Sequence, residues 1–196
     1  MISFSVGIFL ATFIVAIFTT RFFRLIFWYG LNSFILGILA ILIGIKEADK
    51  ALIVSGVITI VLKAFVIPYV LKFISKKFNI QRDIDPSVKV HFNIILIPSI
   101  IVFTFYLVGP FNQTLGVHAN YVAISISTLF LSLVLMIEHS TVAPKIIGFL
   151  MMENSLFLLG ATSTGGMPMF IEIGVFFDLM MAIVIVNLLL KEEGVR

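Results

Sequence analysis

Three ionisable side chains stand midway along segments that are otherwise apolar: Glu153, Asp178 and Lys63. At about 1.5 Å of rise per residue, each lies more than about 13 Å from either end of its segment if that segment is helical. Placing such a group inside a lipid bilayer costs roughly 2.5–3.5 kcal/mol, so each is expected to be neutral, paired or next to water. Three titratable groups at one depth favour a pathway for protons or cations.

A purely structural role is the simplest alternative, with the three groups joining helices through buried hydrogen bonds. Such a bond contributes only about 0.6 kcal/mol within a membrane, which is less than the cost of inserting the group, and an asparagine or a serine would suit that role better. We therefore expect a relay in which Glu153 and Asp178 exchange a proton through water. Lys63 would tune or continue this path.

Four further polar residues are candidates for the same path. Glu172 stands close to the start of the last apolar segment and is either a solvated end charge or part of an exit path. Asn187 is able to line an uptake route, although a helix–helix hydrogen bond is the simpler interpretation. Glu138 and His139 end the fifth segment. They are interpreted first as an interface charge and a solvated histidine, with proton uptake as the alternative.

Seven apolar segments must position these groups. The chain is 61% hydrophobic and 12% charged with a mean hydropathy of +1.21, which is far more apolar than soluble domains usually are. An apolar helix of about 18 residues or more can cross a hydrocarbon core about 30 Å thick. We therefore predict an all-α, multi-pass membrane protein of the plasma membrane, one domain over 1–196 with transmembrane helices at 3–20, 26–45, 51–73, 90–108, 119–138, 144–164 and 168–190.

The basic residues predict the orientation of these spans, because Lys and Arg gather in cytoplasmic loops. Only Lys46 and Lys50 fall on one side of the predicted membrane, and Lys63 falls within it. The other side holds the rest, so the amino terminus is expected outside and the carboxyl terminus in the cytoplasm. The basic residues of that side are Arg21, Arg24, Lys72, Lys76, Lys77, Arg82, Lys89, Lys145, Lys191 and Arg196.

A weak internal repeat relates the second and sixth segments, "RLIFWYGLNSFILG" (24–37) and "KIIGFLMMENSLFLLG" (145–160). Both place a basic residue at the cytoplasmic start, an Asn–Ser pair at mid-span and a glycine beyond it. Asn154, which belongs to the second pair and follows Glu153, is a further candidate for the path. The pattern predicts two parallel three-helix units, 1–75 and 119–190, with 90–108 as the spacer helix that permits their common orientation.

The absence of cysteine excludes disulfides, iron–sulfur clusters and thiolate metal sites. The histidines His91, His118 and His139 fall at predicted helix ends or in loops, which argues against a pair of axial haem ligands at mid-span. We expect no metal site and no cofactor in this chain, and no enzymatic activity of the chain by itself.

The sixth and seventh segments, with "GFLMMENSLFLLG" and "MPMFIEIGVFFDLMMAIVIVNLLLKEE", resemble hydrogenase-4 component E. That family comprises membrane subunits of formate hydrogenlyase and other energy-converting nickel–iron hydrogenases. Residues 119–193 also resemble the three-helix subunit K of complex I and the C subunit of multisubunit cation/proton antiporters. In that subunit two consecutive helices each carry a mid-membrane glutamate, which Glu153 and Asp178 match by position. The second acid is an aspartate here, one methylene shorter.

The resemblance implies a non-redox membrane subunit of a hydrogenase complex, with Glu153 and Asp178 on a polar axis toward antiporter-like subunits. Its expected partners are the other membrane subunits of that complex, including antiporter-like chains and chains like the H subunit of complex I. An antiporter subunit and a purely structural membrane anchor are the alternatives. A self-sufficient transporter is less favoured, because helices six and seven lack an interior proline or glycine pair at mid-span.

Overall fold

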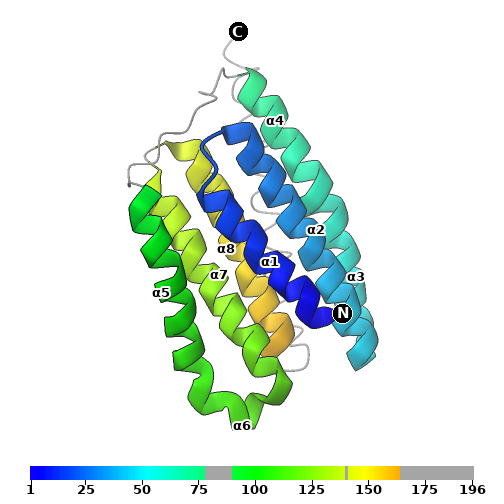
Figure 1. The fold of residues 1–196 in the computed structure, drawn as a ribbon. Helices are drawn as coiled ribbons and strands as arrows, with labels where there is room; N and C mark the ends of the chain where they lie inside the picture. The colour runs from blue at the N-terminus through cyan, green and yellow to red at the C-terminus, as the bar shows by residue number, and fades with distance from the viewer. Residues whose placement is uncertain (78–89, 140, 164–196) are drawn as a thin grey trace.

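The computed structural model describes residues 1–77, 90–139 and 141–163, whose long helices run side by side (Figure 1). Apolar runs of this length form helices because a helix satisfies its backbone donors and acceptors internally. Short 3-10 and α-helical turns, η2 (Gly109–Phe111), α6 (Asn112–Leu115) and η3 (Gly116–His118), connect two of the long helices. The longer elements are α1 (Ile2–Ile17), α2 (Phe22–Glu47), α3 (Lys50–Thr59), η1 (Ile60–Val66), α4 (Ile67–Lys77), α5 (Val90–Val108), α7 (Ala119–Glu138) and α8 (Val142–Ser163).

A tight turn joins α2 to α3. Ala48 ends α2 in the left-handed conformation, with φ of 56°. Asp49 then caps α3, since its Oδ1 accepts hydrogen bonds from the backbone N–H groups of Ala51 at 2.9 Å and Leu52 at 3.3 Å. This turn sends the chain back along α2, so α2 and α3 pack against each other as an antiparallel pair (Figure 1).

The helix that begins with α3 continues without a break through η1 and α4, and η1 is a π-helix. Its last turn closes with a hydrogen bond from the N–H of Ile67 to the carbonyl of Leu62, five residues back. Pro68 follows directly and has no N–H to offer the carbonyl of Ala64. Stretches of π-helix are uncommon and occur frequently at functional sites. Lys63 stands in the middle of this one.

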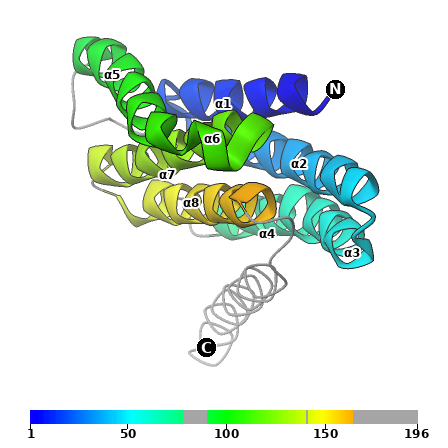
Figure 2. The same cartoon turned by 90° about the horizontal axis from the view of Figure 1, so that it is seen from below.

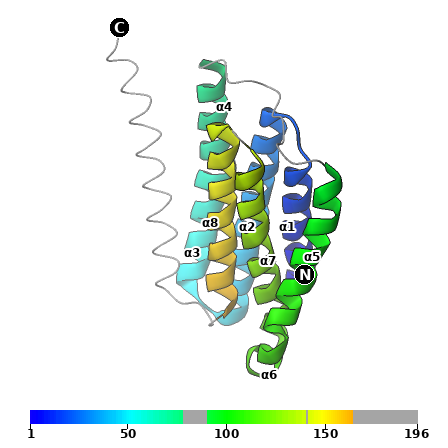
Figure 3. The ribbon, with the colours of Figure 1, turned by 90° about the vertical axis from the view of Figure 1, so that its left-hand side faces the viewer.

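Helices α2, α7 and α8 form the centre of the described bundle, and α1 packs on α2 and α7 (Figure 2). The continuous helix α3–η1–α4 lies on the far side of α2, whereas α5 packs on α7 at the opposite edge (Figures 2 and 3). Helices α2 and α8 run in the same direction (Figure 3). The residues midway along them therefore meet inside the bundle.

Over the residues that it describes, the structure confirms the all-α prediction, and five of these described helices are long and apolar enough to cross a membrane. Helix α1 is apolar but has only 16 residues. The predicted helix over 168–190 lies outside the described residues. Between the helices predicted over 90–108 and 119–138, helical turns fill residues 109–118 and extend the apolar helix of α5 over Phe92–Leu115. The expected orientation and the count of seven spans stay predictions.

Candidate functional site

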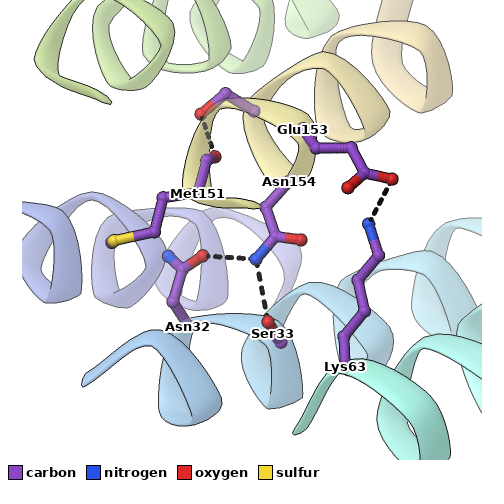
Figure 4. A network of polar contacts seen from close by, with 7 residues as sticks. Asn32, Ser33, Lys63, Met151, Glu153 and Asn154 are labelled. Carbon is purple, nitrogen blue, oxygen red and sulfur yellow. Dashed lines mark hydrogen bonds and ion pairs between the residues drawn. The ribbon is translucent and has the colours of Figure 1, made fainter. Parts of the chain in front are cut away.

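Two of the three mid-span charges lie in direct contact. Lys63 Nζ is 3.0 Å from Glu153 Oε1, so the two side chains form an ion pair between η1 and α8 (Figure 4). Lys63 is 1% exposed and Glu153 4% exposed. The sequence placed both groups at one depth but did not predict that they touch.

The local shape of the helix brings Lys63 to this place. In a π-helix successive residues turn through a smaller angle than in an α-helix, so η1 changes which face each residue after Thr59 presents. Ala64 and Pro68 pack against Gly30 of α2, where a β-carbon would stand 3.3 Å from both the Ala64 oxygen and the Pro68 ring. Lys63 is directed to the other side, toward α8 (Figure 4).

A hydrogen-bonded network lies beside the ion pair and joins three helices. Asn154 Nδ2 donates to Asn32 Oδ1 at 2.9 Å and to Ser33 Oγ at 2.9 Å. Asn32 Nδ2 in turn donates to Thr12 Oγ1 at 2.8 Å and to the carbonyl of Phe9 at 3.4 Å. All four of the polar side chains are buried. The network fixes α8 against α2 and α2 against α1, and so holds Glu153 in its position.

The two Asn–Ser pairs that indicated an internal repeat therefore meet in space, because Asn154 of α8 binds both members of the pair on α2. Ser155, the second member of the α8 pair, instead donates to the carbonyl of Met151 in its own helix. The contact relates the midpoints of two parallel helices, as a repeat of parallel units requires. The division into three-helix units stays a prediction.

Replacing Asn154 with leucine is expected to destabilise the protein by about 1–2 kcal/mol, because two helix–helix hydrogen bonds are lost and Asn32 keeps a buried oxygen without its donor. Ser155→Ala is the matched control and should change stability by less than about 0.5 kcal/mol, because that hydroxyl bonds only within its helix. Unfolding in detergent micelles, followed by circular dichroism, measures both. Equal losses in the two variants would contradict a bridging role for Asn154.

The favoured interpretation of Glu138 and His139 as solvated end groups was wrong. Glu138 is 2% exposed and His139 1% exposed. The side chain of Asn93 on α5 lies near the Glu138 carboxyl group. The His139 ring folds back so that Nδ1 lies 2.9 Å from the carbonyl of Leu135 and donates to it. Helix α5 packs over the end of α7 and buries these two side chains. Position along a helix, which is what the sequence gives, does not predict burial by a neighbouring helix.

The remaining candidates of the sequence are Asp178, Glu172 and Asn187, which lie outside the described residues. Among the residues that the structure does describe, no group of three or more His, Cys, Asp or Glu side chains is arranged to hold a metal ion. The described site therefore consists of one ion pair and one network of neutral hydrogen bonds.

Sequence reasoning missed the glycines that allow η1 to approach. Gly30, Gly37 and Gly44 are spaced by seven residues along α2, and all three face the helix that carries Lys63. A β-carbon at Gly37 would lie 2.8 Å from the carbonyl oxygen of Gly56 on α3. The regular spacing was the signal, because glycines one heptad apart share one face of a helix and let a second helix approach closely.

Comparison with known proteins gives one distant relative. It is a Mycobacterium tuberculosis (strain ATCC 25618 / H37Rv) protein described as "Uncharacterized protein Rv0085". The two sequences are 26% identical over 168 residues, which is 85% of this chain and 75% of the relative. No family model matches the chain. No solved structure matches it either. The similarity extends over most of the chain, and the relative's description names no activity.

Proposed function

We propose that this chain is a multi-pass plasma-membrane subunit of an energy-converting nickel–iron hydrogenase related to complex I. In this role Glu153 and Lys63 belong to a path for protons or cations. The observation that supports the proposal is the ion pair between Lys63 and Glu153, buried midway along the bundle. The resemblance of residues 119–193 to hydrogenase-4 component E is the reason for proposing a hydrogenase complex as the assembly that contains this chain.

Energetics favour a functional reason for keeping this pair. Burying two charges costs several kcal/mol each after relaxation, and well-packed apolar residues in their place are often neutral or stabilising. Inside a membrane, ionisable residues are accordingly rare and mark ion pathways and proton relays. Hydrogen bonds between neutral groups, from Asn154 to Asn32 and Ser33, already join α8 to α2. The added cost of Lys63 and Glu153 is therefore best explained by ion movement.

A lysine within hydrogen-bonding distance favours the ionised form of Glu153, and separation of the two favours its protonated form. A change in the distance between η1 and α8 would thus make Glu153 release or take up a proton. Asp178 is the proposed second carboxyl group of the relay. Movements passed from the hydrogenase subunits would set the distance and so couple hydrogen evolution to ion transport.

The experiment is hydrogen-linked ion pumping in membranes that contain the whole complex, with Glu153→Gln, Asp178→Asn and the double variant. Each single change is expected to lower pumping at least about tenfold, as loss of a positioned proton-transfer group commonly does. Glu47→Gln is the control, because Glu47 ends α2 and lies far along the helix from the buried pair. Full pumping by the double variant would overturn the relay.

Purification of the intact complex tests the assembly separately. A nickel–iron large subunit among the co-purified chains supports the hydrogenase. Antiporter chains without such a subunit would instead assign the protein to a multisubunit cation/proton antiporter. Unchanged pumping by both acid variants within a hydrogenase would leave the chain as a structural anchor, with the Asn154 network as its fastening.

A further inference from the structure

An apolar groove runs along the outside of the bundle between α2 and the helix η1–α4. Its volume is about 370 Å³, and its walls include Phe27, Leu31 and Phe34 of α2 and Phe65 of η1. Phe27 is 56% exposed and Phe65 63% exposed, so the groove opens away from the bundle. Among the described residues that line the groove, Lys72 is the charged one.

The groove exists because the residues at its floor, where the two helices meet, have small side chains. Gly30 and Ala64 supply almost no side chain, and the ring of Pro68 lies directly against Gly30. The larger side chains stand on either side of this floor. If a methylene group takes about the room of a water molecule, roughly 30 Å³, the groove holds about a dozen of them.

Basic side chains gather at one end of the groove. Lys72 lies four residues beyond Pro68 along α4, near the end of that helix at Lys77. Arg24 lies seven residues before Leu31 on α2, which places it on the groove side of the same helix. The start of α2 and the end of α4 are at the same end of the bundle (Figure 1). Both basic residues are exposed.

The geometry points to a binding site for one anionic phospholipid. Its acyl chain lies along the phenylalanine-lined groove, and its phosphate group meets Lys72 and Arg24 at the basic end. The match is one of charge and polarity: an apolar trough with cations at a single end complements an amphiphile with one anionic end. This site lies on the opposite face of η1 from Glu153 and does not depend on the proposed pathway.

Native mass spectrometry of the purified full-length chain tests the site, with phosphatidylglycerol and phosphatidylcholine of identical dioleoyl chains as probes. Lys72→Gln and Arg24→Gln are each expected to weaken phosphatidylglycerol binding about fivefold, the ratio for about 1 kcal/mol per basic residue near a membrane surface. Phosphatidylcholine binding should change little. Leu31→Trp fills the groove and should weaken the binding of both lipids.

Lys145→Gln is the matched control, because Lys145 is an exposed lysine near the start of α8 and outside the groove. Equal weakening by Lys145→Gln and Lys72→Gln would overturn the site, since it would show a general effect of surface charge. Unchanged lipid binding by Lys72→Gln would also overturn it. A benzophenone amino acid in place of Phe65 gives a test that does not depend on the folding of Leu31→Trp. In native membranes it should label lipid, and labelling of a protein instead would assign the groove to a partner subunit.

Discussion

Replacing Lys63 with methionine is expected to lower the free energy of unfolding by about 3–5 kcal/mol, because Glu153 then stays buried without the lysine that balances its charge. Glu153→Met should destabilise the protein by a similar amount, since it leaves the ammonium of Lys63 buried instead. The double variant replaces both charges by apolar groups of similar length. It should recover most of the loss and unfold close to the wild type.

Titration of the purified protein with sodium dodecyl sulfate in detergent micelles, followed by circular dichroism, measures the three variants. Lys145→Met is the control for a lysine in solvent and should change stability by no more than about 0.5 kcal/mol. The decisive quantity is the coupling between the two sites. Losses that simply add in the double variant would show that the pair contributes nothing as a pair, and would remove the main support for the proposed function.

The same variants separate stability from activity. A double variant that is as stable as the wild type but does not pump ions would assign Lys63 and Glu153 to transport alone. Lys63→Glu combined with Glu153→Lys is a sharper form of this test, because it restores an ion pair while moving the carboxyl group from α8 to η1. We expect near-normal stability and lost pumping from this exchange.

The sequence predicted the depth of the charged groups but not their contact. Depth follows from counting residues along an apolar helix, and Lys63 and Glu153 are both midway along theirs. Contact also depends on rotation about the helix axis. A calculation that assumes 3.6 residues per turn fails beyond Thr59, because η1 is a π-helix. No pattern in the sequence predicted the π-helix. Pro68 indicated only that the helix is irregular near Lys63, because proline lacks a backbone N–H.

Burial at the helix ends was the other failure, and its cause is also tertiary. His139 follows the last residue of α7, where a histidine is ordinarily solvated. In the fold α5 lies along α7, and the side chain of Asn93 interacts with neighbouring Glu138. The contact of Asn154 with Asn32 and Ser33 was closer to being predictable, since both Asn–Ser pairs were recognised and stand at corresponding positions of two parallel helices.

Replacing Gly37 with alanine is expected to destabilise the protein by about 1–3 kcal/mol, the usual range for an overpacked contact. The added methyl group would stand 2.8 Å from the carbonyl oxygen of Gly56, and a backbone atom cannot rotate away from it. Helix α3 would have to move outward, and η1 would move with it because the two form one continuous helix. The displacement should also weaken the contact of Lys63 with Glu153.

Gly7→Ala supplies the matched control, because a β-carbon at Gly7 of α1 meets nothing within 4 Å. Alanine is a better helix former than glycine by up to about 1 kcal/mol, so this variant should be equally stable or more stable. Replacement of glycine by alanine is thus expected to lower stability at position 37 and to keep or raise it at position 7. Lys63→Met should also destabilise the Gly37→Ala protein less than the wild type, since the ion pair is already weakened there. Stabilisation by Gly37→Ala would show that a methyl group fits between α2 and α3. It would also show that close packing at the glycines does not determine the position of Lys63.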